Sequence, residues 1–255
     1  MSPRSLIALD FDGVVCDSAG ETGTTGWIAA RSLWPRDFAD APTDAYLADF
    51  RRVRPALETG YEAILLARLL RDAVPPAELL ADAPRHCAAV TAAHALSRDA
   101  LVTLFGATRD RLIHDDFEAW LELHAFYPGT IAAINAWVAA GHRVAVVTTK
   151  EQRFAEALCH HAGCDLAPTA IYGLEAGPKN GVLTDLLAAQ PADTPAVFVE
   201  DRLPTLLKVH DAPALARYRL ALADWGYLRP TDLADARTAH IPTLALTDFP
   251  PLADG

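Results

Sequence analysis

The C-terminal half of the chain alternates between short apolar runs and segments with helical periodicity, and this alternation limits the possible folds severely. Short, fully apolar runs are typical of parallel strands that helices cover on both faces. Such runs, strong or weak, lie at residues 6–9, 144–147, 170–172, 196–199 and 218–223. Helical patterns lie beside them, at residues 128–141, 152–162, 179–189 and 204–210. The alternation predicts an α/β fold, a doubly wound parallel sheet with helices on both faces.

Residues 17–124 do not continue this pattern, because they contain no comparable strand signal and are rich in Ala, Leu, Arg and Asp. Helices are expected within this stretch at residues 61–73 and 99–123. The chain, at 255 residues, is long for one compact domain and short for two full ones. We therefore predict a core formed by residues 1–16 and 125–255, with a helical domain of residues 17–124 inserted into it.

The charge balance limits the classes of ligand. The chain has 22 basic and 33 acidic residues, a net charge of −11, whereas nucleic-acid-binding proteins usually carry a basic surface. We expect no nucleic-acid partner, and an enzyme for phosphates would need local cations or a metal in so acidic a chain.

The cysteine content and the lengths of the apolar runs indicate where the protein is located. Four cysteines are too few for a disulfide framework in a chain of this length. The N-terminal apolar run is interrupted by Asp10 and Asp12, unlike a signal peptide, and no run of about 18 apolar residues occurs. We expect a cytoplasmic protein with no membrane partner.

Acidic residues follow two of the predicted strands. Asp10 and Asp12 come directly after the first apolar run, and Glu200 and Asp201 follow the run at 196–199. Ligands of open α/β sheets bind at the carboxyl ends of the strands, so these side chains are expected at one site. A carboxylate can attack phosphorus, and a second one can protonate the leaving oxygen and later deprotonate water. Asp10, Glu200 and Asp201 together would suit Mg²⁺, which prefers carboxylate oxygens.

Two further residue types fit a phosphate site. Thr148 ends the run at 144–147, and its hydroxyl and the backbone N–H groups that follow, including that of Thr149, could hold a phosphate oxygen. Thr148 is equally interpretable as a helix N-cap. Lys179 stands at a helix start, where a cation is unfavourable unless an anion is close, although a solvated surface lysine would also fit.

These segments occur in the order and at the spacing of four known motifs. They read LIALDFDGVV at residues 6–15, VAVVTT at 144–149, GPKNG at 177–181 and VFVED at 197–201. In these motifs the chain resembles the haloacid dehalogenase superfamily of phosphohydrolases. The resemblance covers about residues 5–18 and 125–246 and implies a Rossmann-like catalytic domain, with residues 17–124 as a helical cap that closes over the site and contributes specificity.

The resemblance also implies a reaction and a role for each residue. The reaction is Mg²⁺-dependent hydrolysis of a small phosphate ester through an aspartyl-phosphate. Asp10 would be the nucleophile and a metal ligand, and Asp12 the general acid and base, with its backbone carbonyl on the metal. Thr148, Thr149 and Lys179 would bind the transferring phosphoryl group. Glu200 and Asp201 would hold the metal, and Thr205 stands where many members of the superfamily carry a second aspartate.

Alternatives remain beside this interpretation. Asp12 argues against a dehalogenase, because the dehalogenases of this superfamily resemble one another in lacking an acid at this position. A phosphomutase would need cations on the cap for a second phosphate, and Arg51, Arg52 and Arg54 could supply them. Arg54 is our candidate for a substrate contact on the cap, although a solvated helix face paired with acids is an equally ordinary interpretation. A protein that keeps the fold and only binds a metabolite or partner is the third possibility. The substrate's identity and the oligomeric state are not evident from the sequence.

Three weaker signals have ordinary explanations. Gly20, Gly23 and Gly26 are interpreted as a hinge or a glycine-rich loop. The cysteines and histidines of residues 159–164 lie within one helix and its cap, so they cannot all converge on a zinc ion. The Trp-Gly-Tyr segment at 225–227 could touch the substrate or the cap, but packing is the more common role of such a segment.

Overall fold

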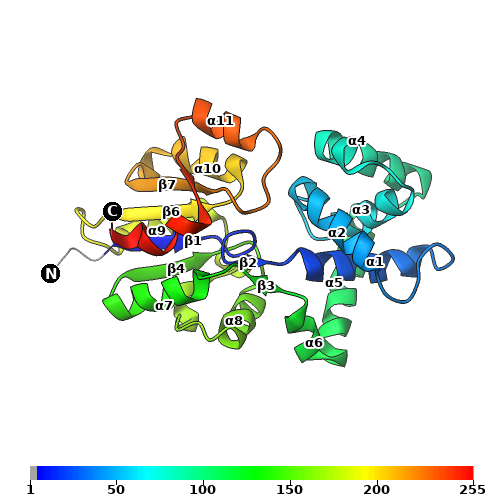
Figure 1. Cartoon of the computed structure of the whole chain (residues 1–255), viewed down its shortest axis with the longest axis horizontal. Coiled ribbons are helices and arrows are strands. Elements are labelled where there is room, and N and C mark those ends of the chain that lie inside the picture. Colours follow the sequence, from blue (N-terminus) through cyan, green and yellow to red (C-terminus); the bar gives the residue numbers. More distant parts are fainter. Residues whose placement is uncertain (1–4, 255) are drawn as a thin grey trace. The chain divides into compact units, whose positions relative to one another are not determined.

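The computed structural model describes residues 5–254, so the ends of the predicted core, residues 1–4 and 255, lie outside the described residues. The chain divides into two compact units (Figure 1), an α/β unit of Met1–Asp17 with Phe126–Gly255 and a helical unit of Ser18–Ala125. Where the chain passes from one unit to the other, two short strands pair, β2 (Cys16–Asp17) and β3 (Ala125–Phe126).

A six-stranded sheet forms the centre of the α/β unit, in the order β5-β4-β1-β6-β7-β8. Its strands are β1 (Leu6–Leu9), β4 (Arg143–Val147), β5 (Ile171–Tyr172), β6 (Ala196–Glu200), β7 (Tyr218–Ala223) and β8 (Thr243–Leu244). All five pairings between them are parallel. β1 is central, with Leu9 opposite Val146 of β4 and Val199 of β6. The prediction of a doubly wound parallel sheet is confirmed.

Helices cover both faces of this sheet. They are α7 (Thr130–Ala140), α8 (Gln152–His161), α9 (Lys179–Ala188), α10 (Leu203–His210) and α11 (Asp232–Thr238). Leu6 and Ala8 of β1 belong to a buried core shared with α9, α10 and α11. Ile7 and Leu9 alternate to the opposite face and are also fully buried. Figure 1 shows α7 and α8 on the other side of the strands from α10 and α11. Burial on both faces explains why the strands read as continuous apolar runs.

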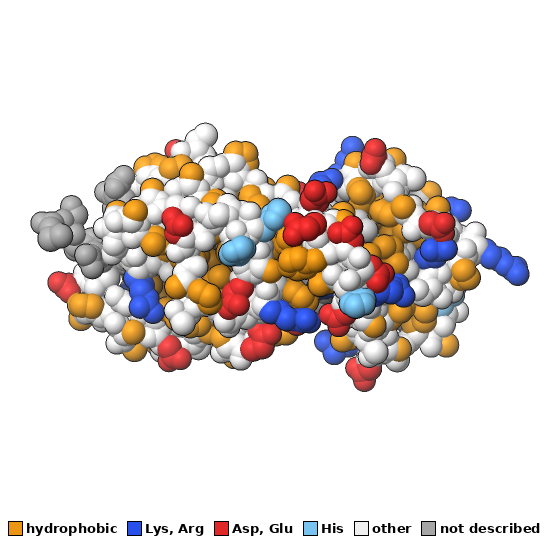
Figure 2. Space-filling view, turned by 90° about the horizontal axis from the view of Figure 1, so that it is seen from below, with side chains coloured by type: hydrophobic (Ala, Val, Ile, Leu, Met, Phe, Trp, Pro, Cys, Tyr) orange, Lys and Arg blue, Asp and Glu red, His pale blue; other side chains and the backbone are white. Residues whose placement is uncertain are grey.

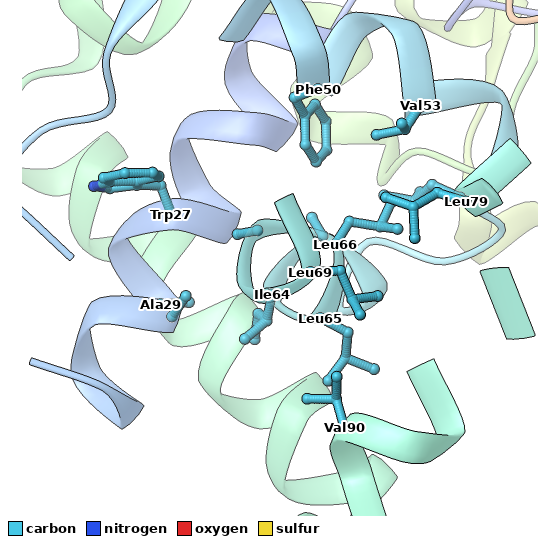
Figure 3. Close-up of a cluster of buried hydrophobic side chains, with 14 of the residues drawn as sticks. Trp27, Ala29, Phe50, Val53, Ile64, Leu65, Leu66, Leu69, Leu79 and Val90 are labelled. Atoms are coloured by element: carbon cyan, nitrogen blue, oxygen red, sulfur yellow. The ribbon is translucent and has the colours of Figure 1, made fainter. Parts of the chain in front are cut away.

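The helical unit contains six α-helices among its described residues. They are α1 (Ala19–Leu33), α2 (Asp44–Val53), α3 (Glu62–Arg71), α4 (Pro76–Ala93), α5 (Arg98–Asp115) and α6 (Phe117–Glu122). Side-chain oxygens of Thr43 and Ser97 cap the starts of α2 and α5 by accepting backbone N–H groups. Figure 3 shows that the core of this unit draws on several helices, with Trp27, Phe50, Leu66 and Leu79 among the converging side chains. This core is made entirely of residues of the helical unit.

The interpretation of the early glycines as a hinge or loop is wrong. Gly20, Gly23 and Gly26 all lie inside α1 and are buried. A Cβ on Gly23 would lie 2.9 Å from the Phe50 ring, and a Cβ on Gly26 would lie 2.7 Å from the Ala63 Cβ. These glycines therefore allow neighbouring helices to approach α1 closely, which compensates for their low helix propensity.

The predicted helix over residues 99–123 is two helices, α5 and α6, separated at Asp116. The backbone of Asp116 is extended, and its side chain accepts the Ala119 N–H at 2.9 Å. Asp116 thus caps a new helix, because aspartate competes with the helical backbone for its hydrogen bonds.

Over residues 5–254, no helix is long and apolar enough to cross a membrane. On the face seen in Figure 2, acidic and basic side chains are interspersed among apolar ones, and the described residues of that face form no large basic patch.

Candidate active site

Asp10, Glu200 and Asp201 meet at the carboxyl edge of the central strands. β1 and β6 pair with Leu9 opposite Val199, and the Asp10 N–H donates to the Val199 carbonyl at 2.9 Å. This register brings the residue after β1 beside the end of β6. Glu200 and Asp201 are fully buried, and Asp10 is 6% exposed. Burial of three acids at one place is unfavourable unless cations compensate them.

Lys179 supplies one such cation. It is the first residue of α9, and its Nζ lies 2.7 Å from Asp10 Oδ1 and 2.6 Å from Glu200 Oε2. The second carboxylate oxygen of Glu200, Oε1, accepts the Arg202 N–H at 3.2 Å. The two carboxylates explain how a lysine is accommodated at a helix N-terminus, where the helix dipole disfavours it.

The buried charges shift one another's protonation. Burial, reinforced by the Glu200 carboxylate, raises the pKa of Asp10 to about 7, against the opposing effect of Lys179. Burial also raises the pKa of Glu200 above its usual range. Burial alone would lower the pKa of Lys179, but Asp10 and Glu200 outweigh it and raise that pKa. Lys179 is therefore held as a cation beside carboxyl groups whose full ionisation needs more positive charge.

The same three acids can hold a metal ion. One carboxylate oxygen from each of Asp10, Glu200 and Asp201 lies within 4.8 Å of the others. Hard oxygen donors from carboxylates suit Mg²⁺, and the ion would supply the positive charge that Lys179 alone does not. Within residues 5–254, this is the one group of three or more acids, cysteines or histidines close enough to bind a metal, so residues 159–164 form none.

Asp201 is held in place by the segment after β7. The Tyr227 N–H donates to Asp201 Oδ2 at 2.7 Å. Gly13 has a positive φ of 93°, and a Cβ there would overlap Asp201 Oδ2. A Cβ on Gly226 would overlap the Cβ of Asp201. Any larger side chain at either glycine would displace this carboxylate.

The Trp-Gly-Tyr segment also binds the loop that follows β1. Trp225 Nε1 donates to the Val14 carbonyl at 3.1 Å, and the Tyr227 hydroxyl donates to Asp17 Oδ1 at 2.7 Å. The segment therefore connects Asp201 to the loop that carries Asp12, through contacts that lie wholly within the α/β unit.

Thr148 and Thr149 follow β4 at the same edge of the sheet. Thr148 is buried, its N–H donates to the Tyr172 carbonyl at 2.9 Å, and its hydroxyl oxygen accepts the Lys150 N–H at 3.1 Å. Thr149 is exposed. The hydroxyl of Thr148 thus stabilises the turn after β4. The interpretation of Thr148 as a helix N-cap is wrong, because Glu151 stands at the N-cap position of α8.

Lys150 is a site residue that the sequence analysis missed. Its Nζ lies 3.3 Å from Asp12 Oδ1, and its side chain is only 6% exposed. The available signal was a lysine directly after a buried strand and two threonines, in a chain with only three lysines.

Arg54 belongs to the helical unit. It begins a short 3-10 helix, Arg54–Ala56, in the helical unit, whereas every residue described above lies in the α/β unit. Of its neighbours, Arg52 forms an ion pair with Asp49 at 2.6 Å on the surface of α2.

Solved structures resemble the chain over its whole length. A predicted phosphoglycolate phosphatase from Haemophilus somnus has a TM-score of 0.63 at 14% identity, covering 100% of this chain and 98% of that one. A predicted phosphatase from Clostridium acetobutylicum has a TM-score of 0.59 at 15% identity, covering 97% and 96%. The Mycobacterium tuberculosis Protein Tyrosine Kinase A has a TM-score of 0.58 at 18% identity, covering 100% of both chains. At these identities the likeness shows the fold alone, and the differing names show that the fold does not by itself determine the reaction.

Comparison of sequences complements the likeness of structures. A search of curated proteins gave no match. The family model for haloacid dehalogenase-like hydrolases matches residues 5–207, which include all the acids, threonines and lysines described above. The chain belongs to the haloacid dehalogenase-like hydrolase family.

Proposed function

We propose that this chain is a Mg²⁺-dependent phosphatase that hydrolyses a small phosphate ester through an aspartyl-phosphate on Asp10. One observation carries the proposal: Asp10 is buried in contact with Lys179 and lies beside Glu200 and Asp201. A buried carboxylate next to a fixed cation and a potential metal site is suited to attack an electrophilic phosphorus.

Four groups of this chain would hold the metal. They are the carboxylates of Asp10, Glu200 and Asp201 and the backbone carbonyl of Asp12. When bound, Mg²⁺ would offset the negative charge of the acids and of the substrate phosphate.

The chain's own residues would carry two successive steps. In the first, an Asp10 carboxylate oxygen attacks phosphorus, the ester P–O bond breaks, and Asp12 gives its proton to the leaving oxygen. In the second, Asp12 takes a proton from water, the water oxygen attacks the same phosphorus, and the bond to Asp10 breaks. The products are the alcohol and inorganic phosphate, and both aspartates return to their initial states.

The remaining predicted residues would bind and orient the substrate. Lys179 holds Asp10 and would contact the transferring phosphoryl group, as would the groups of Thr148 and Thr149. Residues 17–124 would serve as the cap, with Arg54 as a substrate contact. Because one structural neighbour is named as a predicted phosphoglycolate phosphatase, we would test small phosphorylated acids among the first substrates.

The test is hydrolysis of 4-nitrophenyl phosphate and a panel of phosphorylated metabolites with Mg²⁺ or with EDTA. Wild-type protein should release phosphate only with the metal, and Asp10→Asn should lose at least about a thousandfold in kcat. Asp193→Asn, an exposed acid of the same unit, should match wild type.

The intermediate can be measured directly. Protein quenched in acid after mixing with ³²P-labelled substrate should retain label that hydroxylamine removes, as expected of an acyl phosphate, and Asp10→Asn should retain none. Phosphate transferred to a second position of the substrate, rather than released, would instead identify a phosphomutase. Tight binding of a panel member without turnover would identify a binding protein on the same fold.

A further inference from the structure

Lys150 forms a buried ion pair that the proposed mechanism does not use. Its Nζ lies 3.3 Å from Asp12 Oδ1, and the exposed fractions of the two side chains are 6% and 20%. Burying an ammonium group is costly, so a lysine in such a place normally has a specific anionic partner. Here that partner is the acid proposed to protonate the leaving group.

The backbone on both sides of Lys150 is fixed. Its N–H donates to Thr148 Oγ1 at 3.1 Å, and its carbonyl accepts the Leu174 N–H at 2.9 Å. Thr148 continues from the buried strand β4, and Leu174 begins a short 3-10 helix, Leu174–Ala176. The ammonium group is therefore presented from a constrained segment rather than from a mobile surface loop.

The use of lysine in this chain is also informative. The sequence has nineteen arginines but only three lysines, and two of those, Lys150 and Lys179, are paired with acids at this edge of the sheet. Lys208, the third, is exposed on α10. Apart from Lys208, arginine supplies the other basic side chains of the chain, so Lys150 and Lys179 are unusual. The compact ammonium group of lysine, on its flexible stem, fits a confined space beside carboxylates better than the broad planar guanidinium of arginine does.

We propose that Lys150 is a positioning residue for Asp12, and this inference rests on the proposed function. An aspartate side chain can adopt several rotamers, and proton transfer requires its oxygen within about 2.6–3.2 Å of the leaving oxygen. Lys150 Nζ lies beside Oδ1, so it can donate to this oxygen while the other oxygen, Oδ2, carries the proton, and it would hold the Asp12 carboxyl group in one orientation. Lys150 acts through Asp12 and need not touch the substrate.

This role has a consequence that a simple structural or charge role lacks. A good leaving group departs with little help from an acid, whereas a poor one depends on protonation. Loss of Lys150 should therefore slow the hydrolysis of esters of weakly acidic alcohols or phenols more than the hydrolysis of esters of strongly acidic phenols. Phenyl phosphate and 4-nitrophenyl phosphate are nearly the same in shape and differ in this property, so they separate protonation from substrate recognition.

The experiment compares kcat/KM of these two esters, with Mg²⁺, for wild type and for Lys150→Met. The value of kcat/KM reports the first irreversible step, in which the leaving group departs. We expect the loss on phenyl phosphate to exceed the loss on 4-nitrophenyl phosphate by about tenfold or more, a fraction of the full effect of a general acid. Lys150→Arg keeps the charge but not the compact shape, so the difference between the two losses should be smaller than in Lys150→Met but still present. Lys208→Met should match wild type on both esters.

The outcomes separate the inference from the function on which it rests. If Lys150→Met lost the same factor in kcat/KM on both esters, whether through KM or through kcat, the positioning role would be overturned. Lys150 would then only contribute positive charge toward the phosphate group. Wild-type values of kcat/KM for Lys150→Met on both esters would overturn the positioning role as well. If wild type hydrolysed neither ester nor any metabolite, the proposed function and this inference would fall together. Circular dichroism verifies the fold of each variant, and Lys150→Gln replaces Lys150→Met if that variant does not fold.

Discussion

At the residue scale, Glu21 shows how the helical unit accommodates a charge in its interior. It is fully buried in α1, and Arg109 of α5 binds it through both oxygens, with Nε 2.8 Å from Oε1 and Nη2 2.9 Å from Oε2. The Thr25 hydroxyl donates to Oε1 at 2.9 Å. A two-point pairing of arginine with a carboxylate fixes geometry as well as charge, so it sets how α1 and α5 face each other.

Removing the arginine should therefore destabilise the helical unit. Arg109→Ala leaves a buried carboxylate without its cation, and we expect the free energy of unfolding to fall by about 3 kcal/mol, near the lower end for a broken buried pair because Arg109 is partly exposed. Urea denaturation followed by circular dichroism measures the change. Arg111→Ala removes an exposed arginine of the same helix and should cost less than about 0.5 kcal/mol. Equal effects of the two substitutions would contradict this account of Glu21.

At the element scale, the packing of α1 against α3 depends on a small residue. A Cβ on Gly26 would lie 2.7 Å from both the Cβ and the carbonyl oxygen of Ala63. These contacts are too short for real atoms, so the two helices would have to separate. By contrast, a Cβ on Gly106 of α5 would meet no atom within 4 Å beyond its chain neighbours and the backbone of its own helix.

Alanine should consequently have opposite effects at these two glycines. Gly26→Ala should destabilise the protein by about 1–3 kcal/mol through overpacking. Gly106→Ala should stabilise it by about 0.5–1 kcal/mol, because alanine is the better helix former and nothing obstructs its methyl group. Chemical denaturation of both variants tests the pair, and a stabilising Gly26→Ala would show that α1 and α3 are not packed as described.

At the scale of the whole molecule, each unit has its own buried core, and the acidic cluster belongs to the α/β unit alone. Glu200 and Asp201 are fully buried, with Asp10 beside them, so the metal-free protein carries unfavourable repulsion. Such a site gives up stability for the ability to bind a cation, as is common where function needs close like charges.

Both Mg²⁺ binding and the loss of one acid of the cluster should therefore change the stability of the α/β unit, and the two effects should depend on each other. Mg²⁺ at a hundred times its dissociation constant should stabilise wild type by about 2.7 kcal/mol. Asp201→Asn should raise the melting temperature of metal-free protein, because one buried charge is removed, and should lose most of the rise that Mg²⁺ causes. Calorimetry with EDTA and with Mg²⁺ measures both effects, with Asp193→Asn as the control. A variant that kept the full response to Mg²⁺ would exclude Asp201 from the metal site.

How much of the structure the sequence predicts also differs by scale. The α/β class follows from periodicity, and β1, β4 and β6 lie where the apolar runs predict them. Within the helical unit, α1, α2 and α4 were not anticipated, because glycine, proline and polar residues weaken their local signals. Strand β8 has only two residues and has no pattern to detect. The sequence does not predict the place of Lys150, because nothing local distinguishes a lysine that forms an ion pair with a distant acid from a lysine in solvent.

The class of fold and the family follow from the sequence, because apolar periodicity and ordered motifs are local patterns of consecutive residues. Which side chains meet depends instead on the tertiary structure. The register of β1 against β6 joins Asp10 to Glu200, and the start of α9 brings Lys179 to both. The turn after β4 places Lys150 beside Asp12, and the segment after β7 donates a backbone N–H to Asp201. These pairs lie from 21 to 190 residues apart, and contact over such separations depends on packing of the whole sheet, which no local pattern encodes.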